Sequence, residues 1–167
     1  MLKVVRAQGQ GIVSDLGRWG YQHEGVPIGG VLDPFSFGLG NLALGNAVNS
    51  ACLELMGQFD FVCAKPCQVL FANRGAQALL NNKSVLCGQV LTLQEGDVLR
   101  TKPPHLGFWN MLCVQGGVDL PEIMDSRSTC LAAGFGGLQG RALQVGDELH
   151  FTQQCAPSIR TGVRLAM

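Results

Sequence analysis

The sixteen residues from 126 to 141 concentrate side chains that could bind an anion. They contain two arginines, three hydroxyl residues and four glycines, in the order Ser-Arg-Ser-Thr-Cys-Leu-Ala-Ala-Gly-Phe-Gly-Gly-Leu-Gln-Gly-Arg. Arginine offers a planar fork of donors that suits a carboxylate or a phosphate, and glycine lets backbone N–H groups approach a ligand closely. Two interpretations of Ser126, Arg127, Ser128 and Thr129 stay open: anion binding, or a turn that is purely structural.

A second segment, residues 14–33, has the same character. It begins Ser-Asp-Leu-Gly-Arg-Trp-Gly-Tyr-Gln and continues through Gly-Val-Pro and a glycine pair to Asp33. Two such segments in one chain suggest a binding surface built from loops. Asp15 and Arg18 lie three residues apart around a glycine. We expect them to pair with each other or with Arg127 or Arg141, most simply as a structural salt bridge.

Standard nucleotide and nucleophile patterns are absent from these loops. Gln139 takes the last glycine position of G-x-G-x-x-G, and no Gly-Lys-Ser/Thr follows as in a P-loop. The hydroxyls of 126–129 have no base visibly poised beside them, since the three histidines are widely spread.

Two carboxylates outside the 126–141 run are further candidates. Asp33 is most simply the N-cap of a helix, because Pro34 suits the first helical position. Glu54 lies in an apolar strand, where a period of two groups it with Cys52 and Met56. A carboxylate in that setting must be solvated, paired or have a shifted pKa.

Composition limits the partners. The 167 residues are formally neutral and only 14% charged, which argues against nucleic acid and fits either a compact apolar domain or one partly covered by a partner subunit. We expect no membrane span and no targeting stretch at 1–6, and hence a cytoplasmic protein. The seven cysteines are interpreted as buried reduced thiols, and Cys63 with Cys67 as the weaker alternative of half a zinc site.

Short strands separated by turn residues predict a closed or sandwiched β architecture for residues 1–152, followed by a tail or final strand over 153–167. A hairpin is expected around Asn81-Asn82, because asparagine tolerates the left-handed conformation. A helix is expected after Asp33, with Phe35, Leu39 and Leu42 on its apolar face. The expected strands are Leu2–Arg6, Cys52–Met56, Phe59–Cys63, Gln68–Ala72, Ala78–Leu80, Ser84–Leu86, Val90–Leu93, Asp97–Arg100, Phe108–Val114 and Glu148–Thr152.

Motifs along almost the whole chain resemble one family. Asp-Leu-Gly-Arg at 15–18, Gly-Val-Pro at 25–27, Gly-Gly-Val-Asp at 116–119 and Ser-Arg-Ser-Thr at 126–129 are similar to allophanate hydrolase subunit 2. That family is also called the C subunit of 5-oxoprolinase, or the biotin-dependent carboxyltransferase subdomain of urea carboxylase. Family members carry two such halves, and the resemblance covers the first. Asp125 stands where glycine usually precedes Ser-Arg-Ser-Thr.

The resemblance implies a mainly β fold, a cyclophilin-like closed β-barrel with one or two short helices. It also implies a cleft for a small amide or carboxylate substrate, with no metal and no catalytic residue assigned. The residues that would line the cleft are Asp15, Arg18, Asp33, Glu54, Ser126, Arg127, Ser128, Thr129, Gly136, Gly137 and Arg141.

The expected function is that of a component of a multi-subunit amide-processing enzyme of the 5-oxoprolinase, allophanate hydrolase or urea carboxylase type. We expect the chain to be inactive alone, with ATP or biotin acting through partner subunits. Its partners would be a companion subunit and the C-terminal half of the family. The alternatives are a non-catalytic module that binds or regulates a partner, and a stand-alone ligand-binding domain.

Overall fold

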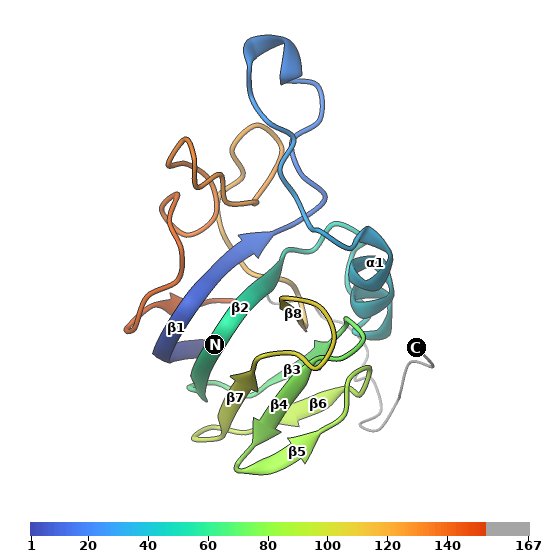
Figure 1. Ribbon diagram of the computed structural model, residues 1–167, viewed down its shortest axis with the longest axis vertical. Helices are drawn as coiled ribbons and strands as arrows, with labels where there is room; N and C mark the ends of the chain where they lie inside the picture. Colours follow the sequence, from blue (N-terminus) through green and yellow to red (C-terminus); the bar gives the residue numbers. More distant parts are fainter. Residues whose placement is uncertain (153–167) are drawn as a thin grey trace.

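Two long antiparallel strands form the centre of the computed structural model, which describes residues 1–152. Strands β1 (Leu2–Ser14) and β2 (Cys52–Cys63) pair from Leu2 opposite Cys63 to Ser14 opposite Cys52 (Figure 1). The sequence predicted only the first part of β1 and divided β2 in two at Gly57, which was interpreted as a turn. Both strands are in fact continuous, because Gly57 lies directly opposite Gly9 within the ladder.

At this pair the two backbones approach so closely that only glycine fits at either position. Gly9 has φ 132° and Gly57 has φ 108°, a backbone region that side chains with a Cβ rarely adopt. A Cβ on Gly57 would overlap the carbonyl oxygen of Gln8, and one on Gly9 would overlap that of Met56.

Beyond the glycine pair, β2 changes partners on its other edge. Residues 53–55 pair with β8 and residues 60–62 pair with β7, so the sheet curls into a half-barrel. The strand order is β5-β4-β7-β2-β8-β3-β6, with β1 on β2 and β9 on β1. The remaining strands are β3 (Cys67–Phe71), β4 (Gln77–Leu80), β5 (Lys83–Val85), β6 (Leu91–Leu93), β7 (Val98–Lys102), β8 (Asn110–Val114) and β9 (Glu148–Leu149).

The mainly β fold with one α-helix and one short 3-10 helix, η1 (Gln22–Glu24), confirms the predicted class. Within residues 1–152 the edge strands β5 and β6 do not pair with each other, so the curl is open there. The hairpin at Asn81 and Asn82 is confirmed, since both residues have positive φ and connect β4 to β5. The expected tail or strand over 153–167 lies outside the described residues.

Two apolar clusters hold the sheet. The larger fills its concave side, and there the alternate β2 residues Leu53, Leu55, Phe59 and Phe61 are fully buried. The smaller lies under α1 (Pro34–Ala43) and includes Phe37, Cys52 and Met111. The alternation of β2 therefore places Glu54 on the same face as Cys52, beside the helix, as the period of two predicted.

The helix begins as predicted but turns a different face to the sheet. Asp33 accepts a hydrogen bond from the N–H of Ser36 at 3.0 Å, and Pro34 opens the first turn. Phe35 and Leu42, expected on the buried face, are 77% and 73% exposed, so that prediction is wrong. The buried face instead carries Phe37 and Gly40, because a Cβ on Gly40 would lie 2.7 Å from Cys113 Sγ and the helix packs that closely. No helix among the described residues is long and apolar enough to cross a membrane.

Six of the seven cysteines lie in the described region, and none of these forms a disulfide. Cys52, Cys63, Cys113 and Cys130 are buried free thiols, as predicted, while Cys67 and Cys87 are half-buried. Burial, together with the neighbouring Cys63, raises the pKa of the Cys67 thiol to about 12. Cys155 lies outside the described residues.

Replacing Gly57 with alanine tests the glycine pair. We expect Gly57→Ala to lower the free energy of unfolding by about 3 kcal/mol or more, because it adds overpacking to a positive φ. Gly96→Ala is the matched control, since Gly96 has φ +87° but no atom within 4 Å of an added Cβ, and it should cost only about 1–2 kcal/mol. Equal shifts of the two midpoints in denaturant unfolding would contradict the role assigned to the close approach.

Candidate functional site

The carboxylate of Asp15, directly after β1, is the meeting point of the two loop segments. It is fully buried. Its Oδ1 accepts hydrogen bonds from the hydroxyls of Ser126 and Ser128, each at 2.6 Å, and from the N–H of Gly17 at 2.8 Å. Its Oδ2 accepts from the N–H of Arg127 at 2.6 Å. The hydroxyl-rich run thus binds an anion, and that anion is the chain's own carboxylate.

Thr129 extends this contact along the end of β1. Its hydroxyl donates to the carbonyl of Val13 at 3.0 Å and accepts from the N–H of Val13 at 3.2 Å. The turn that leads into the segment has positive φ at Met124 and at Asp125, 54° and 57°. Asp125 therefore occupies a conformation that favours glycine and that aspartate tolerates better than most residues.

Arg18 is fully buried beneath the 134–140 loop and has no carboxylate within ion-pair distance among residues 1–152. Its Nη2 donates to the carbonyl of Ser128 and its Nε to that of Ile123 at 3.2 Å. Its Cζ lies 4.8 Å from the ring centroid of Phe135, a cation–π contact. Its Nη1 has no hydrogen-bond partner within the described residues. The expected salt bridge between Asp15 and a guanidinium is wrong, because backbone groups and hydroxyls satisfy the carboxylate.

Arg127 and Arg141, the other two arginines of the prediction, have acidic partners of their own. Arg127 donates to Glu122 at 2.6 Å and to the carbonyl of Leu120 at 2.9 Å. Arg141 forms a two-pronged pair with Asp147, with both distances 2.9 Å. The hydrogen bond from Arg141 lowers the pKa of the Asp147 carboxyl.

Glu54 connects the sheet to the segment before the helix. Its Oε2 accepts from the hydroxyl of Ser14 at 2.8 Å and its Oε1 from the N–H of Leu32 at 2.9 Å. Burial raises the pKa of this carboxyl, while the two hydrogen bonds act in the opposite direction. Through Ser14 the carboxylate of Glu54 is one residue removed from Asp15.

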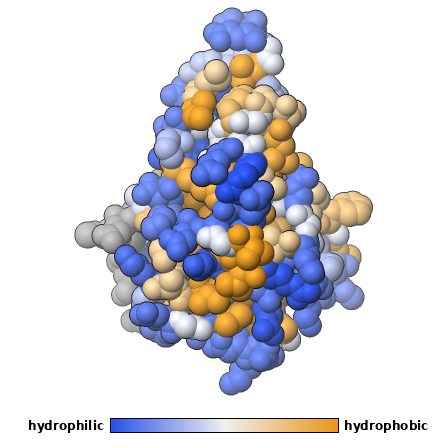
Figure 2. All heavy atoms as spheres, turned by 90° about the vertical axis from the view of Figure 1, so that its left-hand side faces the viewer, coloured by the Kyte–Doolittle hydropathy of each residue, from blue (hydrophilic) through white to orange (hydrophobic). Residues whose placement is uncertain are grey.

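The loop between Gly17 and Gly30 projects from the end of the sheet (Figure 1). Two backbone hydrogen bonds close its neck. The N–H of Arg18 donates to the carbonyl of Ile28, and the N–H of Val31 donates to the carbonyl of Asp15. Near its tip, Tyr21 donates to Asp125 at 2.9 Å, which raises the pKa of the phenol. Figure 2 shows that the tip is hydrophilic and that apolar side chains gather lower on the same face.

A groove of about 470 Å³ runs along the 134–140 loop. Gly136 and Gly137 belong to its wall, and each packs against the segment below. A Cβ on Gly136 would overlap Arg18 and the carbonyl of Ser128, and one on Gly137 would overlap the hydroxyl of Thr129. The N–H groups of Gly136, Leu138 and Gln139 donate to no acceptor within residues 1–152. The other lining residues are Leu120, Pro121, Ile123, Gly134, Phe135 and Gly140.

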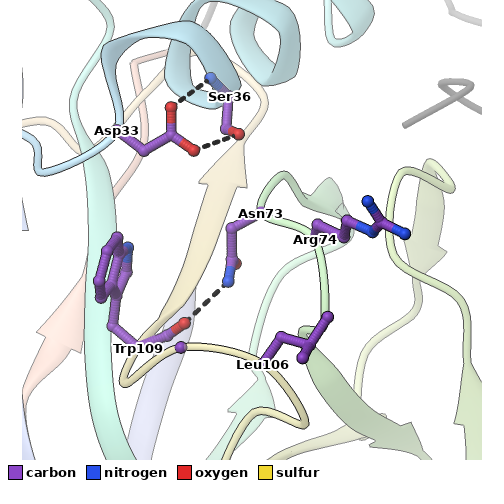
Figure 3. Close-up of a pocket in the computed structure, with 7 residues that line it drawn as sticks. Asp33, Ser36, Asn73, Arg74, Leu106 and Trp109 are labelled. Atoms are coloured by element: carbon purple, nitrogen blue, oxygen red, sulfur yellow. Dashed lines mark hydrogen bonds between the residues drawn. The ribbon is translucent and has the colours of Figure 1, made fainter.

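A separate cavity of about 260 Å³ opens beside the start of α1. Figure 3 shows Asp33 and Ser36 on one wall, Asn73 and Arg74 on another, and Trp109 below. The indole N–H of Trp109 is buried without an acceptor among the described residues, which ordinarily costs about 1–3 kcal/mol. Sequence reasoning selected Asp33 but missed Asn73, Arg74 and Trp109. The only signal for Asn73 and Arg74 was a polar turn after a strand, and Trp109 fell within the expected strand Phe108–Val114.

The structure therefore brings together Asp15, Arg18, the 126–129 segment, Gly136 and Gly137, with Glu54 linked to them through Ser14. It places Asp33 at the other cavity and Arg141 beside Asp147.

Comparison with known proteins agrees with this architecture. The family model described as "Carboxyltransferase domain, subdomain A and B" matches residues 24–165, and the chain belongs to this family. The chain is 37% identical to the C subunit of 5-oxoprolinase from Escherichia coli over 150 residues. These residues make up 89% of this chain and 48% of that protein. The corresponding Haemophilus influenzae protein is 31% identical over the same share of each chain. The chain thus spans about half the length of these relatives.

Larger proteins contain the same unit. The urea amidolyase of Lachancea kluyveri is 33% identical over 138 residues, which are 82% of this chain and 8% of that protein. The crystal structure of the Kluyveromyces lactis urea carboxylase superposes with a TM-score of 0.85 and 30% identity, covering 98% of this chain and 15% of that one. The fold therefore occurs both as part of a subunit and as part of a multidomain enzyme.

Substitution of Asp15 tests its role as the structural anion. Asp15→Asn places an NH2 group against donors that require an acceptor, so we expect the free energy of unfolding to fall by about 3 kcal/mol or more. Asp119→Asn is the matched control, because Asp119 is exposed, and it should change stability by about 0.5 kcal/mol or less. A similar small change in both variants, measured by denaturant unfolding, would show that the buried carboxylate does not hold the loops.

The raised pKa of Glu54 predicts a pH dependence of stability. A folded pKa above the ordinary 4.5 means that the folded chain binds this proton more tightly than the unfolded chain. The contribution of Glu54 is therefore full below pH 4.5 and is lost as the pH rises through the folded pKa. The unfolding free energy of the wild type minus that of Glu54→Gln should decrease as the pH rises above 4.5. A difference that rises over this range would contradict the assigned shift.

Proposed function

We propose that this chain is the part of a multi-subunit amide-processing enzyme that binds a small amide or carboxylate, with the 5-oxoprolinase type as the first candidate. The observation that supports it most is the match to the C subunit of 5-oxoprolinase over 89% of the chain. The matches to urea amidolyase and urea carboxylase point to the same broad class of reaction. ATP or biotin would act on partner subunits, and the protein would be cytoplasmic.

The groove of the 134–140 loop is the proposed place for this ligand. The buried guanidinium of Arg18 lies beneath the groove, against Phe135 and Gly136, and the unused N–H groups of Gly136, Leu138 and Gln139 belong to the groove wall. Fixed backbone donors and a buried guanidinium can stabilise negative charge on a carboxylate or on a carbonyl oxygen under attack. Asp15 and the 126–129 hydroxyls hold Arg18 and the loop in place, and Glu54 supports the neighbouring segment.

A second candidate function is a non-catalytic module that docks a partner. It is favoured by the full engagement of the Asp15 carboxylate and of the Ser126, Ser128 and Thr129 hydroxyls within the chain. It is also favoured by the exposed apolar side chains of Phe35 and Leu42 on the outer face of α1. The relation to a cyclophilin-like barrel stays a prediction.

An ATP-hydrolysis assay distinguishes the two candidates. The chain is assayed alone and with companion subunits and the second half of the family, each with and without 5-oxoproline, and with urea in a parallel reaction. We expect 5-oxoproline-dependent turnover only in the mixture. A mixture that forms a complex by size-exclusion chromatography but never responds to either amide would favour the docking module.

Arg18→Lys tests the groove within the same assay. Lysine keeps the charge but loses the planar fork and the stacking on Phe135, so kcat/KM should fall roughly ten- to hundredfold. Arg6→Lys is the control, because Arg6 is exposed and, within residues 1–152, its guanidinium hydrogen-bonds to the side chain of Gln8. Complex formation and the thermal midpoint are measured for both variants. An unchanged kcat/KM in a folded, assembled Arg18→Lys enzyme would exclude the groove.

A further inference from the structure

The cavity beside α1 has a chemistry of its own and shares no residue with the 134–140 groove. Three separate segments build it: the start of the helix, the turn after β3, and the loop before β8 (Figure 3). Its volume of about 260 Å³ is below the range that holds drug-sized ligands, so only a small molecule fits.

One wall is a hydrogen-bond acceptor. The carboxylate of Asp33 accepts from the N–H of Ser36 at 3.0 Å and from its hydroxyl at 2.5 Å, and it forms no ion pair with residues 1–152. A carboxylate has about four lone-pair positions, so two such bonds leave room for a ligand N–H.

The facing walls supply a flat surface and donors. Trp109 and Leu106 line the cavity and supply its flat, apolar part, whereas the indole N–H of Trp109 is itself enclosed by protein atoms. Asn73 uses one of its two amide hydrogens on the carbonyl of Trp109 at 2.8 Å, which leaves the other available.

At the edge of the cavity, the exposed guanidinium of Arg74 has no partner within residues 1–152. Figure 3 shows it extended away from Trp109, so binding at the cavity requires a change of its side-chain rotamer.

We propose that this cavity binds a small planar amide or urea group that carries a negatively charged substituent. The ligand N–H donates to Asp33, the planar group lies against Trp109, and the carbonyl accepts from the remaining amide hydrogen of Asn73. The negative substituent is held by Arg74. The inference does not rest on the proposed function, because the groove can be correct without this cavity and the cavity without the groove.

The chain's two tryptophans provide a direct test with the full-length, ¹⁵N-labelled protein. Trp19 is 66% exposed and lies outside the cavity, so its indole N–H signal is an internal reference. We titrate urea, N-carbamoylglycine and acetate. N-carbamoylglycine should shift the Trp109 indole signal saturably, leave that of Trp19 in place, and bind roughly two- to fivefold more tightly than urea, the gain expected from an exposed ion pair. The absence of a saturable Trp109 shift with every probe, or equal shifts of both indoles, would overturn the proposal.

Two variants separate the parts of the cavity. Arg74→Gln should reduce the affinity for N-carbamoylglycine to that for urea. Lys83 is an exposed cation on β5 outside the cavity, so the control variant Lys83→Gln should keep the wild-type affinity. Asp33→Asn keeps a good helix cap and should weaken the binding of both probes, because a charged acceptor is lost. Wild-type affinities in Arg74→Gln and Asp33→Asn would overturn the assignment. Loss of binding in the groove variant Arg18→Lys would overturn the cavity and leave the proposed function standing.

Discussion

The buried carboxylate of Asp15 is the interaction on which the arrangement of the loops depends. An ionised carboxylate removed from water is very costly unless it is fully hydrogen-bonded, and here two hydroxyls and two backbone N–H groups satisfy it. Most of those donors come from a segment more than a hundred residues further along the chain. These hydrogen bonds therefore fix the 126–129 segment to the end of β1. They also fix the neck of the 17–30 loop and Arg18, which are hydrogen-bonded to Asp15 and to Ser128.

This arrangement divides the polar residues into two kinds. The carboxylates and hydroxyls expected to face a ligand are mostly engaged inside the chain, whereas the groups still without a partner lie at the groove and at the cavity. Arg18 beneath the groove and Trp109 at the cavity each keep a buried donor without an acceptor among residues 1–152. Both donor atoms are enclosed by protein atoms, so a ligand in the groove or in the cavity would meet the groups around them rather than the donors themselves.

The sheet provides the frame for both places. Because β2 passes from β8 to β7 across the Gly9–Gly57 pair, the sheet curls, and the end carrying Asp15 separates from the end carrying the β4–β5 hairpin. The helix covers the outer face of the curl at close range, since Gly40 packs against Cys113. The start of the helix thereby meets the turn after β3 and forms the cavity wall.

The sequence alone determined the features that depend on neighbouring residues: the short strands, the Asn81–Asn82 turn, and the helix start at Asp33 and Pro34. Local backbone preferences act within a few residues, and the motifs that carry the family resemblance are equally local. Only the tertiary structure decided which face of α1 is buried, which donors satisfy Asp15, and that Asn73 and Trp109 join Asp33. Those outcomes depend on packing between segments far apart in the chain, where no periodicity records which side chain will meet which.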